Sequence, residues 1–360
     1  MLIDWITAYV SLETIGQEHW EKLRLLTERV IRFKPSDTSH DADDCYFLID
    51  RDTVVYETAA WESVRSDSHQ IAFRVGSDAL WIQGSPARVC GSGDAVFGEG
   101  AAAALDLSGC VHRMAAFVSQ KLAIPLFFED KDWHVTRIDL TGNLLLDSVD
   151  DVREALRILR NCEGGRYRVS QQAGDTVYWS HCSRLRSGKA YAKGPHIRHQ
   201  LKQENYTGRM YTLDEQALLD RLLRLELKLG AQWIRERAGV PWFRLNKQDL
   251  TDEWESYFFR MIGAADMHTN DDVKERILAA AKTEGRGKAA YLCFLFIQEH
   301  GWERAKSEYP HNTWYRHLRV IRDAGLGDAD IAAGKVVPLR RRIIECQNVQ
   351  SWPHLFQLAA

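Results

Sequence analysis

The first half of the chain alternates short apolar stretches with polar turns, a pattern that predicts a series of strands and two helices. Residues 1–10 are largely apolar and predict the first strand. Apolar residues at helical spacing predict a helix over 101–123. A second is predicted over 148–161, where acids at the start and arginines near the end match the helix dipole. The other expected strands are 45–50, 53–57, 70–75, 79–83, 133–140, 166–169, 176–179, 186–192 and 222–229.

The order of these elements predicts an α+β fold, with a mainly antiparallel sheet and helices packed on it. Two pairs of strands are joined by short polar turns, and such hairpins place neighbouring strands antiparallel. A Gly-rich loop is expected over 84–100. From about residue 231 the apolar period becomes helical almost throughout. We therefore expect a sheet domain over 1–230 and a helical domain over 231–360.

The helical part contains a compact unit of three short helices. They are predicted over 288–299, 302–308 and 312–324. Pro310 ends the second helix, Asn312 is expected to cap the third, and Gly325 to stop it. A tight break before the last helix is typical of a helix-turn-helix, although many three-helix bundles bind no DNA, so 287–325 is only a candidate DNA-binding unit. The side chains expected to be exposed there and to contact DNA are Trp314, Arg316 and Arg319.

Composition narrows the class of protein. With 45% hydrophobic residues, 27% charged residues and a net charge of −3, the chain is an ordinary globular protein rather than a disordered tail or a small disulfide scaffold. Uncharged apolar runs are too short to span a membrane, and the start contains Asp4 and lacks a basic leader, so a signal peptide is not expected. The seven cysteines include no close pair, which favours reduced thiols in a cytoplasm over zinc sites or disulfides.

The charge is unevenly distributed. Residues 181–250 carry 14 Lys and Arg against 7 Asp and Glu, although the whole chain is slightly acidic. A basic block of this kind is expected for a protein that binds phosphate-rich partners such as nucleic acid. A solvated helix surface would explain much of the same pattern.

The segment from Gly188 to Gly194 contains a tyrosine between two lysines. In a strand, Lys189, Tyr191 and Lys193 lie on one face. Two ammonium groups are expected to favour the phenolate of Tyr191, which could attack a phosphodiester while the lysines hold the phosphate. The alternative is an ordinary Tyr/Lys surface of a sheet.

Two strands share the pattern arginine, aliphatic residue, acid. Arg137 and Asp139 fall on one face of the first, as do Arg224 and Glu226 on the second, so the two acids could meet on adjacent strands and bind a divalent ion. His199 follows nearby, one helical turn after His196, and could bind metal or transfer a proton. Carboxylates with imidazole suit Mg²⁺ or Mn²⁺, which would draw charge from the phosphate oxygens. Two structural ion pairs are the alternative.

Several short motifs occur along the chain in a characteristic order. They include Ile3-Asp4-Trp5, Ile71-Ala72-Phe73-Arg74, Thr136-Arg137-Ile138-Asp139, Ala190-Tyr191-Ala192-Lys193, Arg224-Leu225-Glu226, Asn312-Thr313-Trp314-Tyr315-Arg316 and a late Trp352. On these residues the chain resembles the filamentous-phage replication initiators, the gene II/X-type proteins that nick DNA for rolling-circle replication. The related nucleases with a His-hydrophobe-His metal motif have no counterpart here.

The resemblance implies a nicking and joining domain of rolling-circle-initiator type, a divalent metal and a covalent 5′-phosphotyrosine. Tyr191 and Lys193 match the family's Tyr-x-Lys segment, His199 follows at similar spacing, and the pairs Arg137/Asp139 and Arg224/Glu226 match its paired strand motifs. We therefore expect Tyr191, Lys193 and His199 to act in catalysis, Asp139, Glu226 and His199 to bind metal, and Arg137, Lys189 and Arg224 to contact DNA. His69 and His134 are possible additional ligands, and Tyr206 and Tyr211 are alternative nucleophiles.

The implied partners are origin DNA, as duplex and as single strand, a host helicase and a host polymerase. Self-association on DNA is also possible, no membrane partner is expected, and the implied location is the cytoplasm of a bacterial host. Two other classes stay open: a non-catalytic DNA-binding replication or regulatory protein, and a metal-dependent hydrolase of small phosphate esters.

Overall fold

The structure is a computed structural model, and it is described here for most of the chain. The described residues are 1–24, 30–33, 54–57, 71–89, 94, 96–160, 169–170, 176–202, 209–236, 240–262, 270–327, 331 and 348–359. The expected strand 45–50, His69 and Tyr206 lie outside these ranges.

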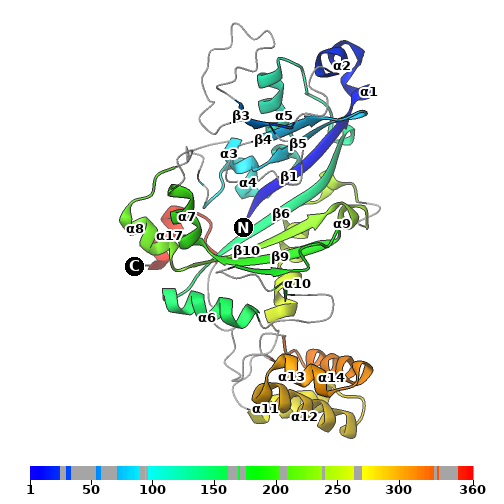
Figure 1. Ribbon diagram of the computed structural model, residues 1–360, viewed down its shortest axis with the longest axis vertical. Coiled ribbons are helices and arrows are strands. Elements are labelled where there is room, and N and C mark those ends of the chain that lie inside the picture. Colours follow the sequence, from blue (N-terminus) through cyan, green and yellow to red (C-terminus); the bar gives the residue numbers. More distant parts are fainter. Residues whose placement is uncertain are drawn as a thin grey trace.

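Within these ranges, a ten-stranded antiparallel sheet forms the centre of the chain's first two-thirds, in the order β3-β2-β4-β5-β1-β6-β10-β9-β8-β7 (Figure 1). The two longest of these strands, β1 and β6, are neighbours at its middle. The strands are β1 (Leu2–Ser11), β2 (Val30–Phe33), β3 (Val54–Glu57), β4 (Ile71–Val75), β5 (Ala79–Gly84), β6 (Trp133–Leu145), β7 (Val169–Ser170), β8 (Thr176–Trp179), β9 (Arg186–Ala192) and β10 (Leu222–Gly230).

Helices flank the sheet and then form a separate group at one end of the molecule (Figure 1). Those associated with the sheet are α1 (Leu12–Ile15), α2 (Gln17–Arg24), α3 (Pro86–Val89), α4 (Gly100–Ala104), α5 (Leu107–Leu122), α6 (Val149–Arg160), α7 (Lys193–Leu201), α8 (Leu213–Leu219), α9 (Ala231–Glu236), α10 (Lys247–Ile262) and α17 (Trp352–Ala359). The separate group is α11 (Asn270–Ala280), α12 (Glu284–His300), α13 (Trp302–Glu308) and α14 (His311–Asp323).

The two faces of the sheet differ in chemistry because side chains alternate along each strand. One face carries aliphatic residues such as Ile138 and Leu225, which form one core with α5, α6 and α10. Trp254 and Tyr257 of α10 lie so close to the sheet that a Cβ at Gly142 or Gly188 would fall 2.6 Å from their rings. The opposite face carries the polar residues of the site described below.

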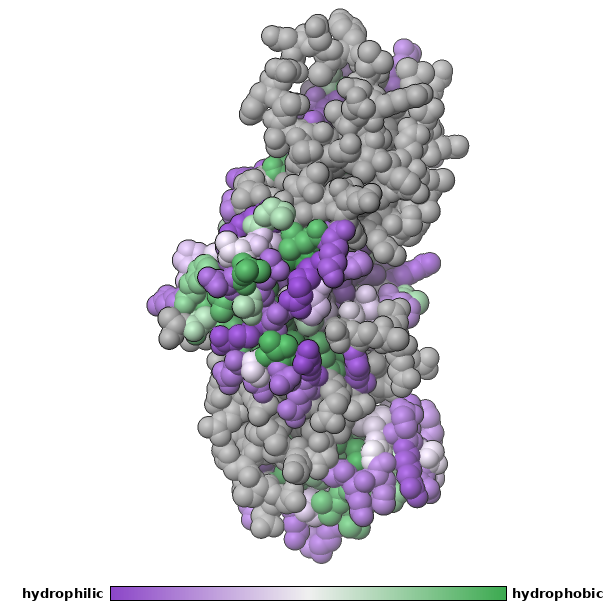
Figure 2. Space-filling model, turned by 60° about the vertical axis from the view of Figure 1, so that its left-hand side comes forward, coloured by the Kyte–Doolittle hydropathy of each residue, from purple (hydrophilic) through white to green (hydrophobic). Residues whose placement is uncertain are grey.

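The group formed by α11 to α14 has its own hydrophobic core. Val273, Phe294, Trp314 and Leu318 are among its fully or almost fully buried members. The C-terminal helix α17 instead returns to the sheet, where Leu355 packs into a small cluster with residues of α7, α8 and β10. In Figure 2, hydrophobic residues gather on the surface at the height of α7, α8 and α17.

The α+β fold class with a helical C-terminal part is confirmed. The predicted domain boundary at residue 230 stays a prediction, although several side chains beyond it, among them Trp233, Leu250 and Phe258, are buried in the core of the sheet. The expected single helix over 101–123 is two helices. Leu105 adopts a left-handed φ of 57°, and the Asp106 carboxylate caps α5 by accepting from the Gly109 N–H at 2.9 Å.

Two expectations about the last helix of the bundle are wrong. Asn312 does not cap it, because the helix begins at His311 directly after Pro310. Trp314 is not exposed: its ring is 2% accessible and packs edge-on against Trp302 with centroids 5.3 Å apart. The apolar face of α14 therefore includes the tryptophan, and the polar face keeps the arginines.

Candidate active site

Strand register brings most of the predicted site residues to the polar face of the sheet. On β10, Arg224 pairs with Tyr191 and Glu226 pairs with Lys189, both on β9. On the other side of β10, Lys228 pairs with Asp139 of β6. The two acids thus lie on adjacent strands, as the sequence pattern predicts. Each is two residues away from the position directly opposite the other, so they are diagonal neighbours on the same face.

Glu226 is the centre of this group. Its Oε1 accepts a hydrogen bond from the Tyr191 hydroxyl at 2.6 Å, and its Oε2 lies 3.4 Å from the Lys189 ammonium. Burial would raise the pKa of Glu226, but the charges of Lys189 and Arg224 and the Tyr191 hydrogen bond outweigh it and lower the pKa. Glu226 is therefore an ionised carboxylate that holds the phenol.

Tyr191 is 4% exposed, and its phenol is neutral. Burial raises its pKa, and the carboxylate of Glu226 raises it further, against the opposing effect of Arg224 and Lys189. The expectation that two lysines favour the phenolate is therefore wrong. Lys189 does lie over the ring, 4.2 Å from its centroid, but the hydroxyl itself faces a negative charge.

The strand ends one residue after Tyr191, at Ala192. Lys193 is the first residue of α7 rather than a strand residue, and it is 1% exposed with its ammonium 6.0 Å from the Tyr191 ring centroid. His196 lies beside the nucleophile candidate, with ring centroids 5.0 Å apart. His199, one turn later, is exposed.

Asp139 is held by its own strand neighbour. Arg137 donates to both carboxylate oxygens, from Nε at 2.8 Å and from Nη2 at 2.5 Å. Burial raises the pKa of Asp139 even against this arginine, and Glu226 raises it further. Arg137 also lies over the Trp5 ring, 5.5 Å from its centroid.

These contacts bear on the predicted metal ligands. All four carboxylate oxygens of Asp139 and Glu226 are occupied by arginine, tyrosine or lysine. Within the described residues no three His, Cys, Asp or Glu side chains form a cluster that could hold an ion, so His199 does not join the two acids. His134 stacks on Tyr9 at 4.7 Å instead. The residues present do not fit a preformed metal site.

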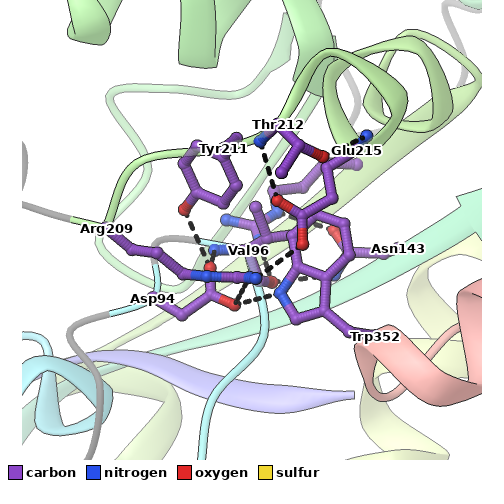
Figure 3. A network of polar contacts seen from close by, with 9 residues as sticks. Asp94, Val96, Asn143, Arg209, Tyr211, Thr212, Glu215 and Trp352 are labelled. Carbon is purple, nitrogen blue, oxygen red and sulfur yellow. Dashed lines mark hydrogen bonds and ion pairs between the residues drawn. The ribbon is translucent and has the colours of Figure 1, made fainter.

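A second polar network supports the site from the side of β6 (Figure 3). Arg224 is 2% exposed and donates to the Asn143 side chain at 2.8 Å and to the Val96 carbonyl. The Val96 N–H in turn donates to Asp94 at 2.8 Å. The buried Arg224 is thus held by a loop that Asp94 fixes.

Asp94 joins three segments that are distant in sequence. It accepts from the Tyr211 hydroxyl at 2.8 Å and from the Trp352 indole at 2.5 Å, and it lies 3.4 Å from Arg209 (Figure 3). Tyr211, an alternative nucleophile in the sequence analysis, is therefore a buried member of this network. Sequence reasoning missed Asp94 in its loop and Asn143 on β6, because no local pattern marks a polar residue whose partners lie on distant segments of the chain.

The arginines of α14 are exposed. Arg316 and Arg319 lie on the solvent side of the helix, next to Tyr315, which is 37% accessible. They stand on the last helix of the three-helix unit, where a helix-turn-helix presents its DNA contacts.

None of the described helices is long and apolar enough to span a bilayer.

Comparison with known proteins covers most of the chain. Residues 2–256 match the family model that describes the N-terminal part of the phage gene II-type replication-associated protein. The chain is 23% identical over 335 residues to the replication-associated protein of Enterobacteria phage fd, an alignment that covers 79% of this chain and 80% of that protein. The proteins of the same name from phages f1 and M13 match with the same identity and coverage.

Proposed function

We propose that this chain, which belongs to the family of phage gene II-type replication-associated proteins, is a rolling-circle replication initiator. In this proposal it nicks one strand at a phage or plasmid-like origin and later rejoins it. The observation that carries the chemistry is the hydrogen bond of 2.6 Å from the Tyr191 hydroxyl to the Glu226 carboxylate. This contact places a carboxylate within hydrogen-bond reach of the phenol proton, which is the geometry that attack assisted by a general base requires.

The proposed reaction is a transesterification. The Tyr191 oxygen attacks the scissile phosphorus while its proton passes to Glu226, the bond from phosphorus to the 3′ oxygen breaks, and that oxygen takes up a proton. The products are a 5′-phosphotyrosine and a free 3′ hydroxyl that can serve as a primer. Because one ester replaces another, the same steps in reverse join the displaced strand.

Several cations surround the tyrosine. Lys189 and Arg224 flank Tyr191 through the strand register, and Lys193 and Arg137 lie beyond them. We propose that these groups hold phosphates and lower the barrier by neutralising charge on the attacked group. His199 is exposed on α7, and its proposed role is the return of a proton during joining.

A requirement for Mg²⁺ or Mn²⁺ is also part of the proposal. Such an ion would draw charge from the non-bridging phosphate oxygens. Since the described carboxylates do not form a ready ligand set, the ion is assigned to no residue and no step is derived through it.

The remaining elements of the proposal concern partners. Origin duplex would bind through Arg316 and Arg319 of α14, and the exposed single strand would bind the polar face of the sheet. Replication from the 3′ hydroxyl would need a helicase and a polymerase of the bacterial host, in whose cytoplasm the protein would act. Self-association on the origin is possible in the same scheme.

The test uses a supercoiled plasmid that carries the origin of the element encoding the chain, with Mg²⁺ present. Tyr191→Phe removes the hydroxyl and is expected to abolish nicking, while Tyr178→Phe is the matched control, since Tyr178 lies on β8 next to Lys189. Nicking by Tyr191→Phe at the parental rate would overturn the proposal.

The second candidate is a non-catalytic DNA-binding replication or regulatory protein. The observation in its favour is that Tyr191 is almost fully buried whereas the arginines of α14 are exposed. This candidate predicts that, in the same assay, the parent protein binds the origin but does not nick it, whichever divalent metal is added.

A further inference from the structure

A row of aromatic rings crosses the polar face of the sheet, away from Tyr191. Tyr9 of β1 is directly opposite Trp81 of β5 on one side and His134 of β6 on the other. The Tyr9 and Trp81 ring centroids are 4.4 Å apart, and those of Tyr9 and His134 are 4.7 Å apart with planes at 18°. Arg74 of β4 ends the row, with its guanidinium carbon 5.7 Å from the Trp81 centroid.

The row is accessible to solvent, unlike the aromatic rings packed in the core. His134 is exposed, and Tyr9, Trp81 and Arg74 are half-buried, whereas rings of the apolar face such as Trp133 and Phe73 are almost inaccessible. Strand spacing of about 4.8 Å makes the four-strand row roughly 14 Å long.

The row is continuous with the candidate active site. Along β1 and β6, Thr7 lies opposite Arg137, and further on Trp5 lies opposite Asp139. The Arg137 side chain is 39% accessible, and its guanidinium lies over Trp5 and holds Asp139. A strand lying on the rings therefore reaches the group around Glu226 without leaving this face of the sheet.

We propose that Arg74, Trp81, Tyr9 and His134 form a stacking platform that an unpaired base of single-stranded DNA extends at its exposed end, on His134. This inference rests on the proposed function, because it assigns the path by which the cut strand enters the site. Within the row the ring faces contact one another, with Tyr9 between Trp81 and His134 and with Arg74 over Trp81, so the free face is the outer face of the exposed His134. An aromatic face stacks on any base, and the arginines at the row and beside it, Arg74 and Arg137, match the negative backbone. A duplex hides its base faces, so it cannot use such a row.

The experiment measures binding alone, so it does not depend on cutting. The full chain carrying Tyr191→Phe is titrated into a fluorescein-labelled single-stranded oligonucleotide of the origin, followed by anisotropy. Adding Tyr9→Leu removes the ring on which His134 stacks, and it is expected to raise Kd by about 5- to 150-fold, the range for loss of one base–aromatic stack. Adding Tyr9→Phe keeps the ring and should leave Kd within about twofold of the background.

Two further measurements keep the outcome clear. Phe127→Leu is the matched control, because Phe127 is a 76% exposed ring outside the row and its loss should not change Kd. Photocrosslinking of the Tyr191→Phe chain to a bromouracil-substituted oligonucleotide is expected to map to Tyr9, Trp81 or His134, even if Tyr9→Leu lowers stability.

The proposal is overturned if Tyr9→Leu and Tyr9→Phe bind alike, if crosslinks map only elsewhere, or if Tyr9→Leu weakens duplex binding equally. Its failure is distinct from that of the proposed function. Loss of the row's effect with intact nicking refutes the platform, whereas binding through the row with no nicking by the parent chain refutes the enzyme.

Discussion

The side chain of Glu226 determines what Tyr191 can do. It faces the phenol at 2.6 Å, and its lowered pKa keeps it ionised at neutral pH. The sequence pattern Arg224-Leu225-Glu226 predicts an acid on this face, but assigns it to a metal. The contact with the hydroxyl depends on the register between β9 and β10, which no local pattern encodes.

Replacing Glu226 with glutamine tests its proposed role as proton acceptor. An amide oxygen can still accept from the Tyr191 hydroxyl but cannot take its proton. Glu226→Gln is therefore expected to slow nicking by about 10²- to 10⁴-fold while single-strand affinity is retained. Single-turnover nicking and anisotropy measure the two quantities.

Glu303→Gln, at an exposed position on α13, is the control for that variant. An unchanged nicking rate in Glu226→Gln would show that the carboxylate is a structural partner of Lys189 and not a base.

At the scale of residues, burial caused the main error of sequence reasoning. The neighbours of Tyr191 were identified from spacing, but the direction of its pKa shift was wrong, because the cost of removing a phenolate from water is invisible in a sequence. Likewise Trp314 was placed on the exposed side of its helix, since the partner ring that buries it, Trp302, belongs to another helix.

Among the elements, the loop at Asp94 connects the strands of the site to α8 and α17. Asp94 is 6% exposed and accepts from Tyr211, Trp352 and the Val96 backbone. Val96 in turn accepts from Arg224, which pairs with Tyr191 across the strands. The C-terminal helix therefore contributes to the position of Tyr191.

Removing the Asp94 carboxylate would leave several buried donors without an acceptor. Asp94→Ala is expected to lower the free energy of unfolding by about 3 kcal/mol or more, as for other broken buried pairs. Urea denaturation measures the change, with the exposed Asp78→Ala as the control. A loss below about 1 kcal/mol, the usual net contribution of one hydrogen bond, would mean that the network does not hold these segments together.

Most elements could be predicted from periodicity, and the departures have local causes. Strand β6 continues to Leu145, beyond its predicted end, because Gly142 sits under the Trp254 ring and Asn143 takes part in the Arg224 network. The break between α4 and α5 occurs because Asp106 caps the start of α5. The sequence prediction missed this cap because the Ala-rich pattern indicated one continuous helix. The role of α17 depends on contacts 258 residues apart and could not be read locally.

In the whole molecule, two surfaces are proposed to contact DNA in different forms. The polar face of the sheet is suited to a single strand, and α14 presents Arg316 and Arg319 from a bundle with a separate core. The basic character of the chain's middle was visible in the sequence, but the separation of the two surfaces between a sheet face and a distant bundle follows only from the fold.

Removing the two arginines of α14 should separate the two kinds of binding. Arg316→Ala with Arg319→Ala is expected to weaken origin duplex binding and to reduce its salt slope by about two, one per phosphate contact. Cutting of a single-stranded origin oligonucleotide should be unchanged. Salt titrations of duplex affinity provide the measurement.

The matched control is Arg276→Ala with Arg304→Ala, at exposed positions on α11 and α13. If the control pair weakens duplex binding as much as the α14 pair, binding is non-specific attraction to the bundle and α14 is not a recognition helix.

The identity of the attacking oxygen can be measured by recovering the covalent complex. The full chain is incubated with single-stranded origin DNA and Mg²⁺, the protein–DNA adduct is isolated, digested with protease and nuclease, and sequenced by mass spectrometry. We expect a nucleotide attached through its 5′ phosphate to Tyr191. An adduct on Tyr178, Tyr206 or Tyr211, or efficient nicking without any adduct, would contradict this account.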